Sequence, residues 1–406
     1  MPWFQRMAKY LLLCIPNGSI PKTYPYLRDL SHVAKPLLFQ GHFLHHPQSG
    51  QGVFTMEMLR HFMLFRRDVT VLLWWSTKKE QEQLQATCAE LGVTNMLGCR
   101  LPSFLPLRLR LLYWEMLWIP WQLAMHRGSV YFSPTVHPML WHTKALDMHM
   151  VLHDAFQFTE KAYLRGWTRK LYNVLLRRTI RHQRIRLHTV SKTSADAIKT
   201  ALDIRKPICI AGNGIDHLQK VEPEAWTSLH KELQLEKPYI LYQGGYDERK
   251  NVRTLIELFP LVREAIPTVQ LVLCGNALHA SPLYGDPKQW AKEPGVHITG
   301  FVTRARLRRL FADAALVVSP TRAEGFNIVI GEALMEGVTV VASDIAVHRE
   351  LWGNHALLTD FSQKKASADL LIAVLQGNIQ GTPLSAEEKR VLSWEHQAGQ
   401  ILATLV

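Results

Sequence analysis

The sequence is poor in cysteine and contains no long uninterrupted apolar run. Its five cysteines are scattered and form no C-x-x-C pair, which argues against a disulfide framework and against a zinc site. The most apolar long stretch, Leu101–Met125, is interrupted by Arg108, Arg110 and Glu115 and carries three prolines, so we expect no membrane-spanning helix. The apolar run at residues 10–16 is too short for a signal peptide, and we therefore expect a cytoplasmic protein.

Acidic residues are scarce in the first half of the chain. Residues 1–200 carry 26 Lys and Arg against 11 Asp and Glu, a net charge of +15, whereas the remaining residues sum to −2. Such an asymmetry indicates a polyanionic partner for the first half, either nucleic acid or an anionic membrane surface. A solvated basic face without any partner is the alternative.

The length of 406 residues exceeds the usual size of a single core, so we expect two domains. A hydrophobic content of 47% and a charged content of 20% are typical of a globular chain and argue against extensive disorder.

Short apolar runs alternate with amphipathic stretches of helical length, which predicts an α/β fold with parallel sheets. The strands expected in the first half are 36–40, 69–74, 129–132, 148–152 and 186–190, and those in the second half are 207–210, 239–242, 269–274, 296–299, 315–318 and 339–342. The helices expected between and after them include 53–65, 252–265, 303–312, 328–336 and 394–404. We predict a first domain over 1–204, a second over 205–385, and a final helical segment, 386–406, packing back toward the first domain.

Two glycine-rich turns stand before or after predicted elements. Ser49-Gly50-Gln51-Gly52 leads into a helix whose first amides would favour an anion, although Thr55 replaces the third glycine of a dinucleotide fingerprint and an ordinary turn is equally possible. Gln243-Gly244-Gly245 follows a buried strand and is followed by Arg249 and Lys250. These two cations suit a diphosphate at the carboxyl end of a strand, with a solvated turn as the alternative.

Two glutamates eight positions apart follow the strand expected at 315–318. Glu324 precedes Gly325 in a loop, the amides of Phe326, Asn327 and Ile328 open a helix, and Glu332 lies within that helix. Two separated carboxylates with phosphate-favouring amides between them suit an extended nucleotide sugar. A hydrolase acid/base pair is the alternative, which the nearby cations make less favourable.

These residues resemble glycosyltransferase family 4, whose E-x7-E motif is similar to the run from Glu324 to Glu332. The loop from Gly244 to Asn251 resembles the family's G-x-x-x-x-[RK]-K-N, residues 213–216 its N-G-[IV]-D, and Gly300-Phe301-Val302 its G-x-V turn beneath the nucleobase. The resemblance is dense over residues 205–396 and sparse before them. It implies a GT-B fold, two Rossmann-like domains whose parallel sheets face an interdomain cleft, and a retaining transferase that uses a nucleotide sugar.

The resemblance also implies roles for single residues. Arg249 and Lys250 would bind the diphosphate, Glu324 a sugar hydroxyl and Glu332 the ribose. The catalytic residues that it implies are His153, Arg249, Lys250 and Glu324. The donor-binding set that it implies is Gly50, Gly52, Gly244, Gly245, Val302, Gly325, Phe326, Asn327, Ile328 and Glu332. No metal ion or other cofactor would be required, and the leaving phosphate would accept the acceptor's proton.

The chain departs from the family pattern after the first glutamate, where Asn327-Ile328-Val329 replaces the common G-[LI]-P. No position selects the donor, but the overall resemblance to bacterial polysaccharide mannosyltransferases favours a GDP-linked hexose such as mannose over UDP-glucose. The acceptor expected is a saccharide or lipid-linked hydroxyl in the synthesis of cell-surface polysaccharide or glycolipid, including lipopolysaccharide.

Competing classes are a sugar-nucleotide epimerase or phosphorylase of the same fold, and a basic nucleic-acid-binding protein. We expect no nucleic-acid partner, because no zinc knuckle or aromatic RNA-binding motif is present. We expect instead that the first domain docks peripherally on an anionic membrane. The aromatic and basic residues that favour this are Phe104, Tyr113, Trp114, Trp118, Trp121, Arg108, Arg110 and Arg127, together with the basic stretch from Arg165 to Arg186.

Overall fold

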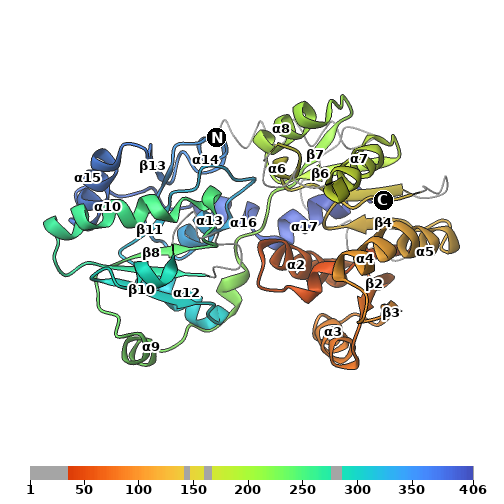
Figure 1. The fold of residues 1–406 in the computed structure, drawn as a ribbon, viewed down its shortest axis with the longest axis horizontal. Coiled ribbons are helices and arrows are strands. Elements are labelled where there is room, and N and C mark those ends of the chain that lie inside the picture. Colours follow the sequence, from red (N-terminus) through yellow and green to blue (C-terminus); the bar gives the residue numbers. More distant parts are fainter. Residues whose placement is uncertain (1–34, 141–146, 160–166, 276–285, 406) are drawn as a thin grey trace. The chain divides into compact units, whose positions relative to one another are not determined.

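The computed structural model describes residues 35–140, 147–159, 167–275 and 286–405. The chain divides into two compact units (Figure 1), one formed by residues 1–213 with 394–406 and the other by Gly214–Ser393. Arg165, the first residue of the predicted basic stretch, lies outside the described residues.

The first unit contains a parallel sheet of seven strands in the order β3-β2-β1-β4-β5-β6-β7. Every described pair in it is parallel, and the central strands are buried apolar runs, as expected when helices cover both faces. The strands are β1 (Leu37–Gln40), β2 (Val69–Trp75), β3 (Asn95–Arg100), β4 (Val130–Ser133), β5 (Asp147–Val151), β6 (Ile185–Thr189) and β7 (Ile208–Ile210).

The side chains of alternate residues of β1 point to opposite faces of this sheet. Leu38 joins a core with Trp114 and Leu176, whereas Phe39 packs edge-on against Phe62 on the other face, with ring centroids 5.9 Å apart. The helices of this unit are η2 (His42–His45), α2 (Gly50–Phe65), α3 (Lys78–Glu90), α4 (Leu107–Tyr113), the π-helical turn η3 (Trp114–Trp118), α5 (Ile119–Met125), α6 (Phe156–Thr159), α7 (Trp167–Arg181), α8 (Lys192–Leu202) and α17 (Trp394–Leu402).

The last helix belongs to the first unit. Trp394 of α17 is fully buried and packs against Phe54 of α2, with ring centroids 5.8 Å apart. The chain thus returns to the first unit after completing the second.

The second unit contains a parallel sheet of six strands in the order β10-β9-β8-β11-β12-β13. Its strands are β8 (Tyr239–Gln243), β9 (Gln270–Cys274), β10 (Val296–Gly300), β11 (Leu316–Ser319), β12 (Val340–Ser343) and β13 (Leu357–Thr359). Its helices are η5 (His217–Lys220), α9 (Trp226–Leu233), η6 (Glu248–Lys250), α10 (Val252–Ala265), α11 (Pro287–Trp290), α12 (Arg304–Asp313), α13 (Ile328–Met335), α14 (Ala346–Leu351), α15 (Lys364–Leu375) and α16 (Ala386–Val391).

The two faces of the second sheet are covered by different helices. Ile240 and Tyr242 of β8 share a core with α10 and α15. On the opposite face, the hydroxyl of Tyr239 donates to the carbonyl of Leu310 in α12, at 2.7 Å. The predicted α/β fold with parallel sheets is confirmed.

Three expectations about the elements need correction. The strand expected at 207–210 pairs with β6 and so completes the first sheet, and the units divide at 213/214 rather than at 204/205. Strands β3 and β13 were not expected.

None of the helices in the described ranges combines the length and the apolarity that crossing a bilayer needs.

A pair of buried histidines joins β5 to β6 and makes stability depend on pH. Nδ1 of His149 lies 2.9 Å from Nε2 of His188, and both rings are about 1% exposed. Burial, with help from Arg186, lowers the pKa of His188 to about 4, so the folded chain keeps this ring neutral while the unfolded chain protonates it near pH 6.5.

We therefore expect the contribution of His188 to the free energy of unfolding to be constant above pH 6.5 and to fall between pH 6.5 and pH 4, by up to about 1.4 kcal/mol per pH unit. Urea denaturation at pH 7.5 and pH 5.0 measures this difference. His188→Leu should reduce it, and His46→Gln, which changes an exposed histidine, should not. An equal difference in wild type and His188→Leu would contradict the assignment.

Candidate functional site

The candidate site lies at the carboxyl ends of the strands of the second unit. The strand order reverses direction between β8 and β11, and ligands of open α/β sheets bind beside such a reversal. The segments that follow these two strands carry Arg249, Lys250 and Glu324, which the sequence analysis singled out.

Glycines occupy the positions of this site at which three loops approach one another closely. The amide of Gly244 donates to the carbonyl of Cys274, and the amide of Gly275 donates to that of Gly300. A Cβ atom on Gly275 would lie 1.9 Å from the carbonyl oxygen of Gly244, so only glycine fits there. Gly245 contributes its carbonyl, which accepts from the hydroxyl of Tyr242 at 2.5 Å.

Arg249 and Lys250 converge on one oxygen of Glu324. Nζ of Lys250 lies 2.6 Å and a guanidinium nitrogen of Arg249 3.0 Å from Oε1. The hydroxyl of Thr321 lies 3.2 Å from the same atom. Burial raises the pKa of Glu324, but the two cations outweigh it and lower the pKa to about 2.

Arg249, Lys250 and Glu324 together carry one net positive charge, and the carboxylate of Asp247 lies 3.8 Å from Nε of Arg249. The side chains of Arg249 and Lys250 remain 25% and 19% exposed, so solvent reaches part of each. Lys250, Arg249 and Thr321 all meet the Glu324 carboxylate at Oε1. The family resemblance implies separate roles for the two cations and Glu324, whereas the structure joins these side chains in one cluster.

Backbone contacts hold the two loops together around this cluster. The amide of Arg322 donates to the carbonyl of Arg249 at 2.8 Å, and the guanidinium of Arg249 donates to the carbonyl of Ala323 at 2.8 Å. Asn251 has a left-handed backbone and its side-chain amide donates to the carbonyl of Pro320, at 3.1 Å. The loop after β8 is thus fixed against the loop after β11.

Asn327 explains how this chain tolerates its departure from the family pattern. The residue has φ +65°, a left-handed conformation in which asparagine is tolerated better than most residues with a Cβ. Its side-chain amide donates to Ser319 Oγ at 2.7 Å and to Nε2 of His348 at 2.9 Å. His348 therefore carries its proton on Nδ1 and donates it to the carbonyl of Ser343.

Phe326 supports the loop through packing. Its ring is buried edge-on against Trp352, whose indole N–H donates to the carbonyl of Phe326 at 3.0 Å. Gly325 and Ile328 flank this anchored residue, and α13 begins at Ile328. The side chain of Phe326 is thus part of the core, which leaves its backbone for any contact with a ligand.

Glu332 lies on α13 and is only 5% exposed. Its Oε1 is 3.0 Å from Nε2 of His217, whereas Oε2 is buried and has no hydrogen-bond partner among the described residues. His217 is a functional candidate that the sequence analysis missed, although it directly follows the Asn-Gly-Ile-Asp run. The position before Glu332 must be small, since a Cβ on Gly331 would lie 2.4 Å from Ile215.

The turn after β10 also borders the carboxyl ends of the strands. Gly300 has φ +66°, and the following Phe301 is an exposed aromatic side chain. Val302 is half-buried and precedes Thr303, the N-cap of α12.

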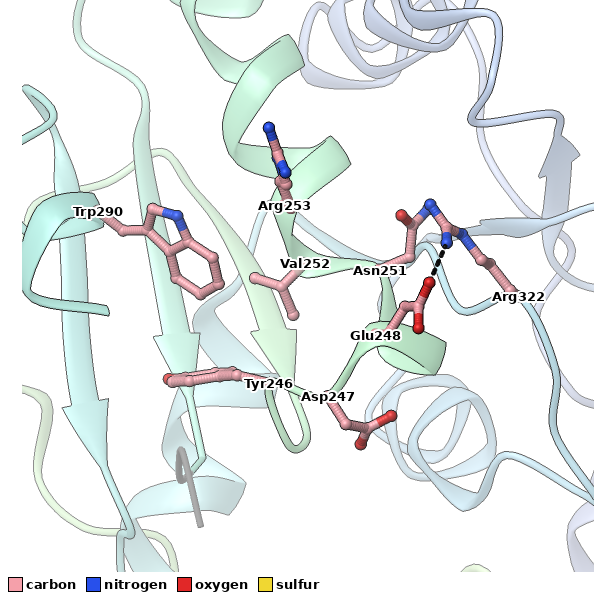
Figure 2. Close-up of a pocket in the computed structure, with 8 residues that line it drawn as sticks. All are labelled: Tyr246, Asp247, Glu248, Asn251, Val252, Arg253, Trp290 and Arg322. Atoms are coloured by element: carbon pink, nitrogen blue, oxygen red, sulfur yellow. Dashed lines mark ion pairs between the residues drawn. The ribbon is translucent and has the colours of Figure 1, made fainter. Parts of the chain in front are cut away.

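A small cavity of about 220 Å³ lies next to the cation cluster, on the loop that joins β8 to α10. Figure 2 shows Tyr246, Val252 and Trp290 together on one side of it and the ion pair of Glu248 with Arg322 on the other. Tyr246 and Trp290 meet edge to face and are nearly fully buried. The cavity therefore offers a ligand mainly the exposed ionic side.

The other predicted site residues, Gly50, Gly52 and His153, belong to the first unit. Nε2 of His153 donates to the carbonyl of Pro134 at 3.0 Å, and burial lowers its pKa to about 4, so the ring is neutral at pH 7. Gly52 is required by packing, because a Cβ there would lie 1.9 Å from the carbonyl oxygen of His46. Gly50 has open space around it.

The aromatic residues predicted to dock on a membrane divide into two groups. Phe104, Tyr113 and Trp121 are exposed, whereas Trp114 and Trp118 lie in the core, so their predicted surface role is wrong. In α7, Arg177 and Arg181 donate to the carbonyls of Ala201 and Leu202. These two arginines therefore stabilise the fold in addition to contributing positive charge. No group of three or more metal-ligating side chains occurs in the described parts of the chain.

Sequence comparisons place the strongest similarity in the second unit. Residues 237–377 match the family model of "Glycosyl transferases group 1". A phosphatidyl-myo-inositol mannosyltransferase of Mycobacterium leprae is 30% identical over 40% of this chain and 45% of its own length. An O-antigen chain mannosyltransferase B of Escherichia coli is 27% identical over 46% of this chain and 50% of its own. The chain thus matches about half the length of these curated relatives.

Solved structures share the fold over nearly the whole chain. WaaG, a glycosyltransferase involved in lipopolysaccharide biosynthesis, superposes with a TM-score of 0.63 at 16% identity, covering 89% of this chain and 94% of its own. Anabaena HepE, solved in complex with UDP and glucose, gives a TM-score of 0.61 at 18% identity, covering 91% and 94%. These matches establish that the chain has the GT-B fold.

Proposed function

We propose that the protein is a retaining glycosyltransferase that moves a hexose from a nucleotide diphosphate sugar to an acceptor hydroxyl. The observation that carries this proposal is the convergence of Arg249 and Lys250 on Glu324, with Glu332 nearby in the sequence on α13 presenting an unpaired buried oxygen. A cationic cluster suits a diphosphate, and unpaired carboxylate oxygens suit sugar hydroxyls. The family match over residues 237–377 supports the same assignment.

In the proposed reaction the bond between the anomeric carbon and the diphosphate oxygen breaks. The acceptor oxygen forms the new bond to that carbon on the same face, and its proton passes to the leaving phosphate. Arg249 and Lys250 stabilise the negative charge that grows on the diphosphate, which favours the transition state over the bound substrate. Glu324 holds both cations in place and orients the donor sugar through Oε2.

His153 has a positioning role in this proposal. Its proton lies on Nε2 and is donated to Pro134, and its pKa of about 4 keeps it neutral over the physiological range. We therefore propose that it neither protonates the leaving group nor attacks the sugar.

The donor is tested by incubating the purified protein with GDP-mannose and UDP-glucose, with and without EDTA. We expect a rise in melting temperature and slow donor hydrolysis with GDP-mannose, because a ligand that binds only the folded state stabilises it. Activity should survive EDTA, since Arg249 and Lys250 would face the diphosphate where a divalent ion would otherwise bind. Stabilisation by UDP but not GDP would reverse the donor preference, and a requirement for a divalent ion would contradict metal independence.

We further propose that the first unit contacts an anionic membrane. There the protein would meet its acceptor, a saccharide or a lipid-linked hydroxyl. Five large apolar side chains at intervals of four residues along α4, η3 and α5 are exposed by 39–66%: Leu109, Tyr113, Leu117, Trp121 and Met125. We refer to them as the apolar stripe. Aromatic and aliphatic side chains on one side of a helix favour the boundary between headgroups and acyl chains.

The π-helical turn η3 keeps the apolar stripe on one side of the helix. In an α-helix, residues four apart rotate by about 40° at each step, which would turn the stripe by about 160° from Leu109 to Met125. A π-turn accommodates one extra residue and reduces this rotation to about 60°. The stripe therefore forms one continuous surface.

The charges beside the apolar stripe favour anionic lipids over a second copy of the chain. Arg100, Arg108 and Arg127 are exposed, and the one acidic residue between positions 100 and 127, Glu115, is buried. Burial raises the pKa of Glu115 to about 8, so it adds little negative charge at neutral pH. Each cation near an anionic surface contributes roughly 1 kcal/mol to binding.

Sedimentation with phosphatidylglycerol-containing vesicles at low salt tests this contact. We expect the wild type to sediment and the Leu117→Ala/Trp121→Ala variant to bind at least several-fold more weakly. Leu64→Ala removes an apolar side chain that is 71% exposed outside the stripe and should bind as the wild type does. A wild type that stays in the supernatant would contradict docking without affecting the proposed transferase activity.

A further inference from the structure

Gln243 is a partly buried amide that has no role in the proposed reaction. It is the last residue of β8 and pairs in register with Cys274, the last residue of β9. Its Oε1 is buried and has no hydrogen-bond partner among the described residues. Its side chain retains partial exposure, so a ligand at the strand ends can reach it.

The alternation of side chains along β8 places Gln243 on the face that carries Glu332. Ile240 and Tyr242 point into the core beneath α10 and α15, so Gln243 points to the opposite face, where Tyr239 bonds to α12. Helix α13 also packs on β11 and contacts α12. Glu332 therefore projects from a helix on the same side of the sheet.

Cys274 links the two residues spatially. Burial raises the pKa of its thiol to about 11, and the carboxylate of Glu332 is close enough to raise it further. The register partner of Gln243 is thus a neighbour of Glu332 and is itself neutral. Oε1 of Gln243 and Oε2 of Glu332, neither of which has a hydrogen-bond partner among the described residues, therefore lie on the same side of the sheet, near Cys274.

A buried acceptor without a partner destabilises the fold, and an apolar residue of similar size would avoid that cost. A ligand that supplies hydroxyl donors satisfies both oxygens at once. The hexose and the ribose of a nucleotide sugar both present adjacent hydroxyls. Because the proposed reaction places the hexose at Glu324, the ribose, with its 2′ and 3′ hydroxyls, is the part left for Gln243 and Glu332.

We propose that Oε1 of Gln243 accepts a hydrogen bond from a ribose hydroxyl of the bound nucleotide, beside the one that Glu332 accepts. This inference rests on the proposed function, because it assumes that a nucleotide binds at the strand ends of the second unit. It assigns to Gln243 a part in recognising the ribose through one of its two hydroxyls.

The test is isothermal titration of wild type and Gln243→Leu with UDP, GDP and their 2′-deoxy and 3′-deoxy analogues. We expect Gln243→Leu to bind the preferred ribonucleotide roughly three- to tenfold more weakly than the wild type does. The loss should disappear with the analogue that lacks the hydroxyl bound by Gln243, because neither protein can then make the bond. The unliganded variant should melt no lower than the wild type, since the change removes an unpaired buried oxygen.

Gln270→Leu is the matched control. Gln270 lies at the opposite end of the same sheet, where its Oε1 accepts from the amide of Glu236 at 2.7 Å, and its replacement should leave nucleotide affinity unchanged. Equal affinity of wild type and Gln243→Leu for the ribonucleotide would overturn this inference while leaving the proposed function in place. An equal loss for all three forms of the nucleotide would also overturn it, and a wild type that binds neither UDP nor GDP would overturn both.

Discussion

Changing Arg249 and Lys250 together to glutamine is expected to lower kcat/KM by roughly a hundredfold to ten-thousandfold. Each cation that bonds to a charged group contributes about 1.5–3 kcal/mol, and both would be lost at the diphosphate. The steady-state rate of transfer or of donor hydrolysis measures the effect. The carboxylate of Glu324 would lose both cationic partners, so its pKa should rise from about 2, because burial raises it and the two cations are the main groups that lower it.

The control for this variant is Arg322→Gln. Arg322 belongs to the loop that carries Glu324, but its side chain is 59% exposed and pairs with Glu248 at 3.5 Å (Figure 2). Its replacement should change kcat/KM by less than about threefold, because exposed ion pairs contribute about 1 kcal/mol or less. Wild-type turnover in the double variant would contradict the placement of the diphosphate.

Gly275→Ala is expected to unfold or severely destabilise the second unit, by more than about 3 kcal/mol. Gly275 has φ +141°, and its new Cβ would lie 1.9 Å from the carbonyl oxygen of Gly244. The loop could accommodate the methyl group only by separating the ends of β8 and β9, which would also displace Gly244 from the site. Thermal or urea denaturation and nucleotide binding together measure this loss.

Gly377→Ala is the control that separates the energetic cost of a positive φ from the cost of a steric clash. Gly377 also has a positive φ, +76°, but nothing lies within 4 Å of the added Cβ. We expect a cost of about 1–2 kcal/mol there and unchanged nucleotide binding. Similar stability losses in the two variants would show that the contact with Gly244 is unimportant.

The helices and strands that could be predicted from the sequence are those whose own pattern of apolar residues determines them. Strands such as β8 and β11 are buried apolar runs, and α10 was predicted with the bounds that the structure shows, Val252–Ala265. Strand β3 escaped prediction because it is an exposed edge strand interrupted by Gly98. That glycine is needed there, since a Cβ on it would lie 1.9 Å from the ring of Trp75 in the neighbouring strand.

The candidate site was predictable in its residues but not in its contacts. The spacing of Glu324 and Glu332 and the Arg249-Lys250 pair are local patterns, whereas the ion pair of Lys250 with Glu324 joins positions 74 residues apart. His217 and Gln243 likewise gain their relevance from Glu332, which is distant in sequence. The burial of Trp114 and Trp118 depends on the phase of a helix that contains a π-turn, which composition does not reveal.

The π-turn η3 makes the length of this helix as important as its composition. Deleting one residue between Trp114 and Trp118 would remove the extra residue and restore a regular α-helix, with α5 keeping its rotation relative to α4. Trp121 and Met125 would stay on the side of Leu109 and Tyr113, whereas the same deletion within α4 or α5 would rotate everything after it by about 100°. A single deletion inside the π-turn should therefore harm the chain less than one in either flanking helix.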